Sequence, residues 1–289
     1  MADKPTDSKG TPTLRGFFAA NPRVALAFSG GVDSSYLLWA AAHYGADVTA
    51  YYVRTPFQPV FELEDARQVA ELAGARMKVL DFDVLTDAQV AANPFDRCYY
   101  CKQNIFSRIG QAARADGYSL LMDGTNASDD ASDRPGMRAL RELGVRSPLR
   151  ECGLTKAEIR RRSRAAGLPT WDKPAYACLA TRVAAGEAIT AEKLATTERA
   201  ETFLHDLGLR DFRVRMAGGV AKLQVRAADL SLVMERREEI LHELGPLYQA
   251  VTLDLATRPD SAAAESTLPA TPDSVSECPT STIPRGAVS

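Results

Sequence analysis

One short stretch, RVALAFSGGVDSS at residues 23–35, constrains the fold of this chain more than any other. A strand-like apolar run ends in Gly30 and Gly31, and a helix-like pattern follows at once. A helix N-terminus leaves backbone N–H groups unpaired, and glycines let an anion approach them closely. The stretch therefore predicts a strand–loop–helix unit that binds phosphate. The hydroxyl donors of this loop are Ser29, Ser34 and Ser35.

An acidic residue, Asp33, lies inside this loop. A carboxylate repels phosphate unless a divalent cation lies between them, so Asp33 predicts bound Mg²⁺. We also expect Asp33 to be a catalytic residue. Two better-known phosphate loops are excluded, because the chain has neither Gly-x-x-x-x-Gly-Lys-[Ser/Thr] nor a Gly-x-Gly-x-x-Gly that opens a helix. The structural alternative is an ordinary tight turn with Asp33 capping a helix.

Strand-like and helix-like patterns alternate over the first 166 residues, which predicts βαβ units and a doubly wound parallel sheet of the α/β class. We expect strands over 23–28, 47–53, 76–84 and 118–124, and helices over 34–44, 62–73, 99–115, 134–143 and 155–166.

The order of elements changes after a loop at 167–189, where a second, smaller α+β domain is expected. Its predicted elements are a helix over 190–207, strands over 211–217 and 220–226 with a Gly218-Gly219 hairpin turn, a helix over 228–243 and a strand over 248–255. We therefore divide the chain into a nucleotide domain (14–170), a cysteine-bearing junction (171–189) and a substrate domain (190–257). Residues 1–13 and 258–289 are polar and are expected to be disordered.

A second polar segment, DGTNASDDASDRPG, follows the strand predicted at 118–124. Ligands of open α/β sheets bind at the carboxyl ends of the strands, so this segment is expected beside the phosphate loop. Gly124 and Asn126 would then contact the ligand, Asp129 or Asp130 would help to hold Mg²⁺, and Arg134 would neutralise a phosphate or carboxylate. The alternative is a polar loop rich in turn-forming residues.

The five cysteines carry the second chemical signal. Cys98 and Cys101 have the Cys-x-x-Cys spacing of metal and redox sites, and Cys178 follows downstream in the proline-restrained segment WDKPAYACLATR. Three thiolates can hold a [4Fe–4S] cluster with one iron left open. Zinc with Cys152 as a fourth ligand competes with this interpretation, and surface thiols without a shared role are the structural alternative. Cys278 lies in the polar tail and is discounted.

Charge and hydropathy exclude several classes of function. The 35 basic and 37 acidic residues give a formal net charge of −2, so we expect neither nucleic acid nor a membrane among the partners. The first residues lack the apolar core of a signal peptide, and no run of about 18 apolar residues occurs. We therefore expect a cytoplasmic protein with reduced thiols.

The stretch SGGVDS resembles the pyrophosphate loop of the ATP pyrophosphatase (PP-loop) superfamily, whose members cleave ATP between its α and β phosphates and adenylate a substrate oxygen. This resemblance implies that the loop binds ATP. The residues implied are Ser29, Gly30, Gly31, Asp33, Ser34 and Ser35.

Residues 14–255 resemble one PP-loop subgroup, the ATP-dependent sulfur transferases of nickel-pincer nucleotide synthesis, which serves lactate racemase. The segments that carry the resemblance are SGGVDSS, RCYYCK, DGTN, RSPL, LTKAEIR, GLPTWDKPAYACLATR and RVR. It implies a small-molecule substrate, pyridinium-3,5-biscarboxylic acid mononucleotide, in which ATP activates a carboxylate for conversion to a thiocarboxylate. It also implies a homo-oligomer, a hexamer, and pathway partners that carboxylate the substrate, insert nickel or supply sulfide.

The resemblance assigns two possible roles to Cys178. In the single-cysteine form its thiolate attacks the adenylate and gives up its sulfur, which leaves dehydroalanine. The additional Cys98 and Cys101 are typical of a variant in which all three cysteines hold a [4Fe–4S] cluster, and we favour this variant. Cys178 is then a ligand and is not consumed.

In the second domain, the resemblance makes Arg213 and Arg215 clamps for the substrate phosphate, whereas a solvated strand face is the simpler interpretation. Glu201 matches an acid of the family that orients the substrate or moves a proton. Gln224 stands where the family often has Glu, which puts an acid role there in doubt.

Three other functions stay open. A tRNA-thiolating PP-loop enzyme would share the loop and the cysteines but normally needs a broad basic surface. An amidotransferase-type relative, such as an NAD synthetase, would leave the cysteines without a role. A non-catalytic nucleotide sensor would not need the acidic residues that handle a metal.

Overall fold

The computed structural model describes residues 12–129, 134–174 and 176–258. Cys278 and Asp130 lie outside these residues. The disorder predicted for the two ends of the chain also falls outside them. Three residues at the margins of the expected tails, Pro12, Thr13 and Arg258, are described. Thr13 accepts a hydrogen bond from the Gly16 N–H at 3.1 Å, and Arg258 contacts Asp211.

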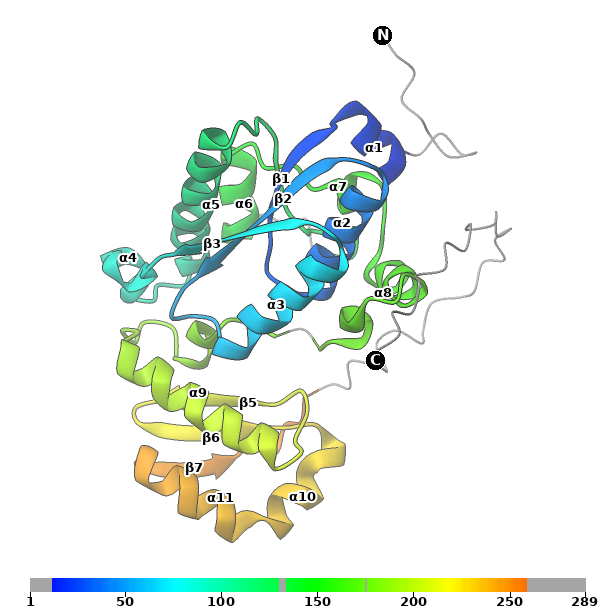
Figure 1. Ribbon diagram of the computed structural model, residues 1–289. Helices are drawn as coiled ribbons and strands as arrows, with labels where there is room; N and C mark the ends of the chain where they lie inside the picture. Colours follow the sequence, from blue (N-terminus) through cyan, green and yellow to red (C-terminus); the bar gives the residue numbers. More distant parts are fainter. Residues whose placement is uncertain (1–11, 130–133, 175, 259–289) are drawn as a thin grey trace, which may run out of the picture.

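The first part of the chain forms a four-stranded, all-parallel sheet in the order β3-β2-β1-β4, as the alternating pattern predicts (Figure 1). Each strand pairs with the next in parallel register, from Arg23 opposite Asp47 to Arg54 opposite Asp81. The strands are β1 (Arg23–Ala27), β2 (Asp47–Arg54), β3 (Arg76–Asp81) and β4 (Leu121–Met122).

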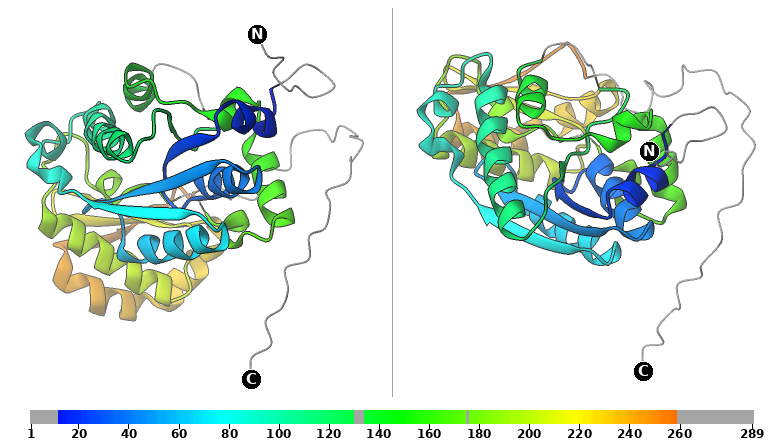
Figure 2. Two further views of the ribbon diagram at one scale, coloured as in Figure 1. Left: turned by 45° about the horizontal axis from the view of Figure 1, so that its top comes forward. Right: turned by 90° about the horizontal axis from the view of Figure 1, so that it is seen from above.

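Helices cover both faces of this sheet (Figure 2). Side chains alternate along the strands, so that Leu26 and Ala50 pack into the core on one face while Ala25 and Tyr51 pack into the core on the other. The described helices of this part are α1 (Leu14–Ala20), α2 (Val32–His43), α3 (Val60–Leu72), α4 (Ala88–Ala91), α5 (Arg97–Ala115), α6 (Pro135–Glu142), α7 (Pro148–Glu151) and α8 (Lys156–Ala165).

Several element boundaries differ from the sequence expectation. Strand β4 has only two residues instead of seven, since beyond β1 it meets only an isolated bridge between Met122 and Arg146. β3 ends at Asp81, and Asp83 then caps a short 3₁₀ turn, η1 (Val84–Thr86). Helices α1, α4 and α7 were not predicted, because each has seven residues or fewer and shows little periodicity.

The second part is a smaller mixed sheet of β5 (Arg213–Ala217), β6 (Val220–Gln224) and β7 (Ala250–Leu253), with α9 (Ala191–Asp206) packed against it. β5 and β6 are antiparallel, and both glycines of their turn, Gly218 and Gly219, have positive φ, as the hairpin signal predicts. β7 runs parallel to β6. The helix expected over 228–243 is divided at Arg236 into α10 (Leu230–Glu235) and α11 (Arg237–Leu244).

The junction is packed and does not behave as a free linker. It contains two 3₁₀ turns, η2 (Pro169–Asp172) and η3 (Leu179–Arg182), and residues of η3 lie in a separate apolar cluster with Phe57 and Leu194. This cluster joins loops of the first part, the junction and the start of α9. Across the described ranges, no helix combines the length and the apolar character that a bilayer crossing requires.

Candidate active site

The phosphate loop has the conformation that its sequence predicts. Gly30 has φ +70°, and a Cβ there would come within 3.0 Å of the Ala66 Cβ, so glycine is required on both counts. Gly31 is the N-cap residue of α2. The Ser29 and Ser34 hydroxyls lie 3.1 Å apart and brace the loop, which leaves the first N–H groups of α2 directed out of the helix end.

The DGTN segment lies against this loop, as expected. A Cβ on Gly124 would come within 2.9 Å of the Ser34 backbone nitrogen, so the end of β4 and the start of α2 are in direct contact. Asn126 is buried, and its N–H donates to Asp129 Oδ2 at 2.8 Å. The two segments, about 90 residues apart in sequence, therefore form one site at the carboxyl edge of the sheet.

The carboxyl group of Asp33 has one paired and one orphaned oxygen. Its Oδ2 accepts from Lys156 Nζ at 2.7 Å, whereas Oδ1 is buried without a hydrogen-bond donor among the described residues. Burial raises the pKa of Asp33 above its ordinary value, the charge of Asp129 adds to this, and Lys156 opposes it. An orphaned carboxylate oxygen near a second carboxylate fits Mg²⁺, which prefers hard oxygen ligands.

The protein side chains alone do not complete a metal site. Among the described residues no group of three or more His, Cys, Asp or Glu side chains is arranged to hold a metal ion. Mg²⁺ usually takes one or two carboxylates and completes its shell with water and substrate phosphates, so the magnesium site at Asp33 and Asp129 stays a prediction.

Lys156 was not identified as a functional residue from the sequence. It is the first residue of α8 and follows Thr155, whose side chain caps the helix by accepting from the Glu158 N–H. The ion pair joins residues 123 positions apart, so no local pattern could indicate it. Arg134 is exposed and is the N-cap residue of α6; its contact with a phosphate stays a prediction.

The three predicted cysteines converge around a residue that the sequence analysis did not single out, Arg97. Its Nη2 lies 3.8 Å from Cys98 Sγ and 3.9 Å from Cys178 Sγ. Burial raises the pKa of Cys101 to about 12, and the charges of Cys178 and Cys98 contribute to the increase. The three sulfur atoms therefore share one electrostatic environment, as the spacing led us to expect.

The two metal predictions for the cysteines stay predictions. Sulfur donors are of the right type for an iron–sulfur cluster, but the three thiols as placed are not a metal-holding group in the described residues. Cys152 is buried in the core around α2, apart from the other three, and is not a fourth ligand for zinc. Burial also raises the pKa of Cys178, and the Arg97 charge opposes this.

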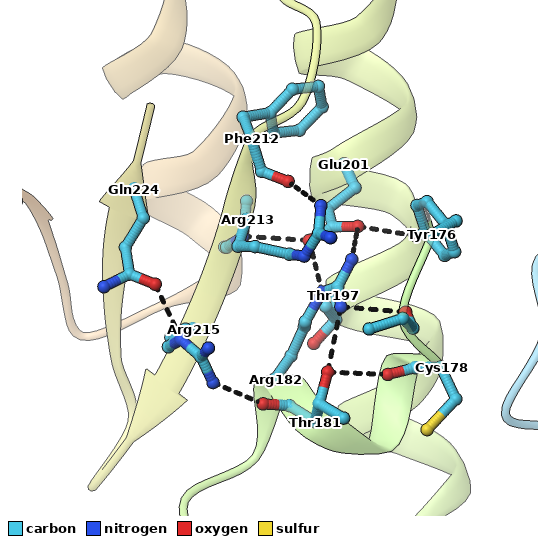
Figure 3. A network of polar contacts seen from close by, with 12 residues as sticks. Tyr176, Cys178, Thr181, Arg182, Thr197, Glu201, Phe212, Arg213, Arg215 and Gln224 are labelled. Atoms are coloured by element: carbon cyan, nitrogen blue, oxygen red, sulfur yellow. Dashed lines mark hydrogen bonds and ion pairs between the residues drawn. The ribbon is translucent and has the colours of Figure 1, made fainter. Parts of the chain in front are cut away.

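A buried ion pair fixes the junction to the second domain (Figure 3). Arg182 donates to Glu201 from Nε at 2.7 Å and from Nη2 at 2.9 Å, and its side chain is 0% exposed. Glu201 also accepts from the Tyr176 hydroxyl at 2.6 Å and from the Val214 N–H at 2.9 Å. With four donors on its two oxygens, Glu201 is better suited to orient its neighbours than to move a proton.

Arg213 and Arg215 both lie at the junction side of β5, as their alternation predicts (Figure 3). Arg215 donates to Thr181 O and to Gln224 Oε1, each at 2.7 Å, so Gln224 orients an arginine here. Burial, together with the charges of Arg182 and Arg258, lowers the pKa of Arg213 to about 10.

Arg258 was placed in the tail by the sequence analysis and therefore missed. It donates to Asp211 O at 2.9 Å, and its charge acts on both Arg213 and Arg215. Crowded guanidinium groups disfavour each other's charge, so an anion that binds among them is stabilised.

A cavity of about 540 Å³ opens between the junction and the second sheet. Arg97 and Cys98 line it on one side, and Arg215 adds positive charge. Arg182 and Lys222 also line it, but they are paired with Glu201 and Asp254. None of its lining residues belongs to the phosphate loop, and Cys178 is not among them. The cavity is therefore a cationic pocket beside the cysteines, and Cys98 is the cysteine exposed to it.

Helix α3 connects the two halves of the site. Ala66 packs against Gly30 of the phosphate loop, and Asp65 forms an ion pair with Lys173 of the junction at 2.7 Å. The Phe61 ring packs edge-to-face on Tyr176, with 5.8 Å between ring centroids. One rigid element therefore contacts both the phosphate loop and the cysteine-bearing junction.

Comparison with known proteins identifies relatives of this chain. No protein-family model matches it. An uncharacterized protein of Synechocystis is 36% identical over 248 residues, which cover 84% of this chain and 92% of the relative. A tRNA-specific 2-thiouridylase of Frankia alni is 28% identical over 189 residues, 53% of each chain. The pyridinium-3,5-bisthiocarboxylic acid mononucleotide synthase of Lactiplantibacillus plantarum is 33% identical over 238 residues, covering 81% of this chain and 86% of the synthase. The chain therefore belongs to the family of this pyridinium-3,5-bisthiocarboxylic acid mononucleotide synthase.

Proposed function

We propose that this protein is an ATP-dependent, AMP-forming sulfur transferase that converts a carboxylate of pyridinium-3,5-biscarboxylic acid mononucleotide into a thiocarboxylate. The observation that carries the proposal is the convergence of three cysteines beside a cationic pocket, on a chain that also has a phosphate loop. The printed name of the Lactiplantibacillus relative supports this substrate.

The first half-reaction is adenylation. A substrate carboxylate oxygen attacks the α-phosphorus of ATP, the bond to the β-phosphate oxygen breaks, and an acyl adenylate and pyrophosphate result. The N–H groups at the start of α2 and the Lys156 ammonium would bind the pyrophosphate. Mg²⁺, held by Asp33 and Asp129, would neutralise phosphate charge.

The second half-reaction transfers sulfur. In the single-cysteine route, the Cys178 thiolate attacks the acyl carbon, AMP leaves, and a thioester forms. Loss of the Cys178 α-proton then breaks the Cβ–S bond, which yields the thiocarboxylate and dehydroalanine. In the cluster variant, Cys178 would instead be a ligand together with Cys98 and Cys101 and would not be consumed. Arg97 stabilises the thiolate, since its guanidinium lies beside Cys178 Sγ.

The pocket supplies the site for the nucleotide phosphate. Arg215 lines its wall, and the charges of Arg182 and Arg258 act on Arg215. A guanidinium binds a phosphate bidentately, which would fix the pyridinium end toward the cysteines. Glu201 would position this group through Arg182 and the Val214 N–H.

A matched pair of variants tests the division of labour. Cys178→Ala should release pyrophosphate from ATP and substrate at the wild-type rate but form no thiocarboxylate. Cys152→Ala changes a thiol in the core, apart from the other three cysteines, and should both release pyrophosphate and form thiocarboxylate. Loss of pyrophosphate release in Cys178→Ala would contradict the separation of the two half-reactions.

The source of the sulfur is tested on the wild-type protein. After one turnover, intact mass should fall by about 34 Da if Cys178 gives up its sulfur. The [4Fe–4S] cluster on Cys98, Cys101 and Cys178 predicts instead iron and sulfide in anaerobically purified protein, with no change in mass. The structure provides ligands of the right type without the arrangement, so both assays are needed.

Thiolation of tRNA is the second candidate, because the Frankia thiouridylase matches 189 residues. A net charge of −2 disfavours it. Pyrophosphate release stimulated by tRNA, and not by the pyridinium nucleotide, would favour this candidate.

We also propose a homo-oligomer, a hexamer, that receives its substrate from a carboxylating enzyme and delivers its product to a nickel-inserting protein. Light scattering of the purified chain tests the assembly.

A further inference from the structure

The loop between α4 and α5 presents an aromatic side chain to solvent. Phe95 is 95% exposed, more than any other large apolar side chain among the described residues. Single exposed apolar residues are common and need no explanation by themselves. The way in which this loop is held, and what lies next to it, distinguish Phe95 from the others.

The backbone beside Phe95 is fixed by buried contacts. Asn93 has φ +54°, a left-handed conformation that is costly for most residues, and it is 3% exposed. Its Nδ2 donates to Ala184 O at 2.8 Å, its Oδ1 accepts from Arg97 Nη1 at 2.8 Å, and its carbonyl accepts from the Gly186 N–H at 2.8 Å.

Pro94 then restricts φ at the next position. A strained residue persists only where its surroundings over-determine it, and such sites are frequent around ligands. The loop therefore holds the Phe95 backbone in one place although the ring has no packing partner that buries it.

Phe95 lines the mouth of the cationic pocket and is the only aromatic side chain among the described residues that line it. The charged groups of the lining are Arg97, Arg182, Arg215 and Lys222. Arg182 is paired with Glu201 and Lys222 with Asp254, whereas Arg97 and Arg215 donate to uncharged oxygens and supply the positive charge of the wall. They attract phosphate and carboxylate groups but repel a ring that is itself cationic. The face of a phenyl ring has the opposite preference, because its quadrupole attracts a cation.

We propose that Phe95 stacks on the pyridinium ring of the substrate and selects a positively charged ring over a neutral one. The inference rests on the proposed function, since it takes its substrate from there. In this arrangement the anionic groups face the cationic walls and the ring lies under the phenyl face.

The test compares two ligands that differ in ring charge. One is pyridinium-3,5-biscarboxylic acid mononucleotide, and the other is its 1,4-dihydropyridine form, which has the same phosphate and carboxylates on a neutral ring. Calorimetric titration of the full chain should give wild-type protein a preference for the pyridinium form. Phe95→Leu, which keeps apolar bulk without a quadrupole, should weaken pyridinium binding about 5- to 30-fold and leave dihydropyridine binding within about twofold. Phe95→Trp should keep the preference.

Leu255→Ala is the matched control, because Leu255 is 88% exposed and does not line the pocket. It should bind both nucleotides as wild type does. If Phe95→Leu still prefers the pyridinium form as wild type does, the inference is wrong. The inference is also wrong if light scattering shows a changed oligomeric state of Phe95→Leu while this preference for the pyridinium form is intact. If wild-type protein binds and thiolates the substrate, such a result refutes the role of Phe95 alone. If wild-type protein binds neither nucleotide, the proposed function fails as well.

Discussion

The Arg182–Glu201 pair offers the sharpest energetic test of how the two parts of the chain are joined. Glu201→Gln removes the negative charge and leaves a guanidinium whose side chain is 0% exposed opposite a neutral amide. Removing one partner of a buried ion pair typically costs about 3–5 kcal/mol, because the remaining charge stays desolvated. Since domains are stable by only about 5–15 kcal/mol, Glu201→Gln should remove a large share of the free energy of unfolding.

The assay is equilibrium unfolding in urea followed by circular dichroism. Arg199→Ala is a matched control on the same helix, α9. Its partner, Glu243, lies at 3.7 Å, and the two side chains are 65% and 39% exposed. An exposed pair of this kind contributes about 0–1 kcal/mol.

A double variant separates burial of charge from packing. Arg182→Met with Glu201→Leu replaces both charges by apolar groups of similar size, so it should recover the part of the loss that comes from the unpaired charge. Recovery should be incomplete, because the Tyr176 hydroxyl and the Val214 N–H lose their acceptor. If Glu201→Gln lowers the free energy of unfolding no more than Arg199→Ala does, the reasoning is refuted. The buried guanidinium would then be neutralised or solvated by groups other than Glu201.

Two further predictions concern the phosphate loop and helix α3. Gly124→Ala places a Cβ 2.9 Å from the Ser34 backbone nitrogen and should raise the Kd of ATP about tenfold or more, whereas Gly245→Ala, with nothing within 4 Å, should change it less than twofold. Burial raises the pKa of Glu62 to about 7, so the folded state holds a proton that the unfolded state loses, and stability falls as pH rises from about 4.5 to 7. Glu62→Gln should therefore raise Tm relative to wild type at pH 8 but hardly at pH 5. Exposed Glu64→Gln serves as the control, and a Tm gain that does not depend on pH would contradict the assignment.

Local patterns were sufficient for much of the fold. The apolar run and the glycines of residues 23–35 determine a strand, a turn and a helix start among near neighbours in sequence, and the structure confirms all three. The alternation of strands and helices likewise predicted a parallel sheet, and Gly218-Gly219 predicted a hairpin. These features depend on backbone conformation and on the spacing of apolar residues, which a few adjacent residues encode.

Short elements and long-range contacts were not predictable in this way. Strand β4 is short because its outer neighbour contributes a single bridge, and α4 has too few residues to show a period. Arg258 follows the last strand in a polar stretch. Only its contact with Asp211 in the structure shows that it lies near Arg213 and Arg215.

The sequence by itself determined which chemical groups are present: a glycine loop at the end of a strand, an acid inside that loop and three cysteines. Only the tertiary structure decided which groups meet. It brought Lys156 to Asp33, Arg97 to both Cys98 and Cys178, and an exposed phenyl ring to a cationic pocket. The physical reason is that such pairs form through the packing of whole helices and sheets, where each partner's position depends on residues far from it in the chain.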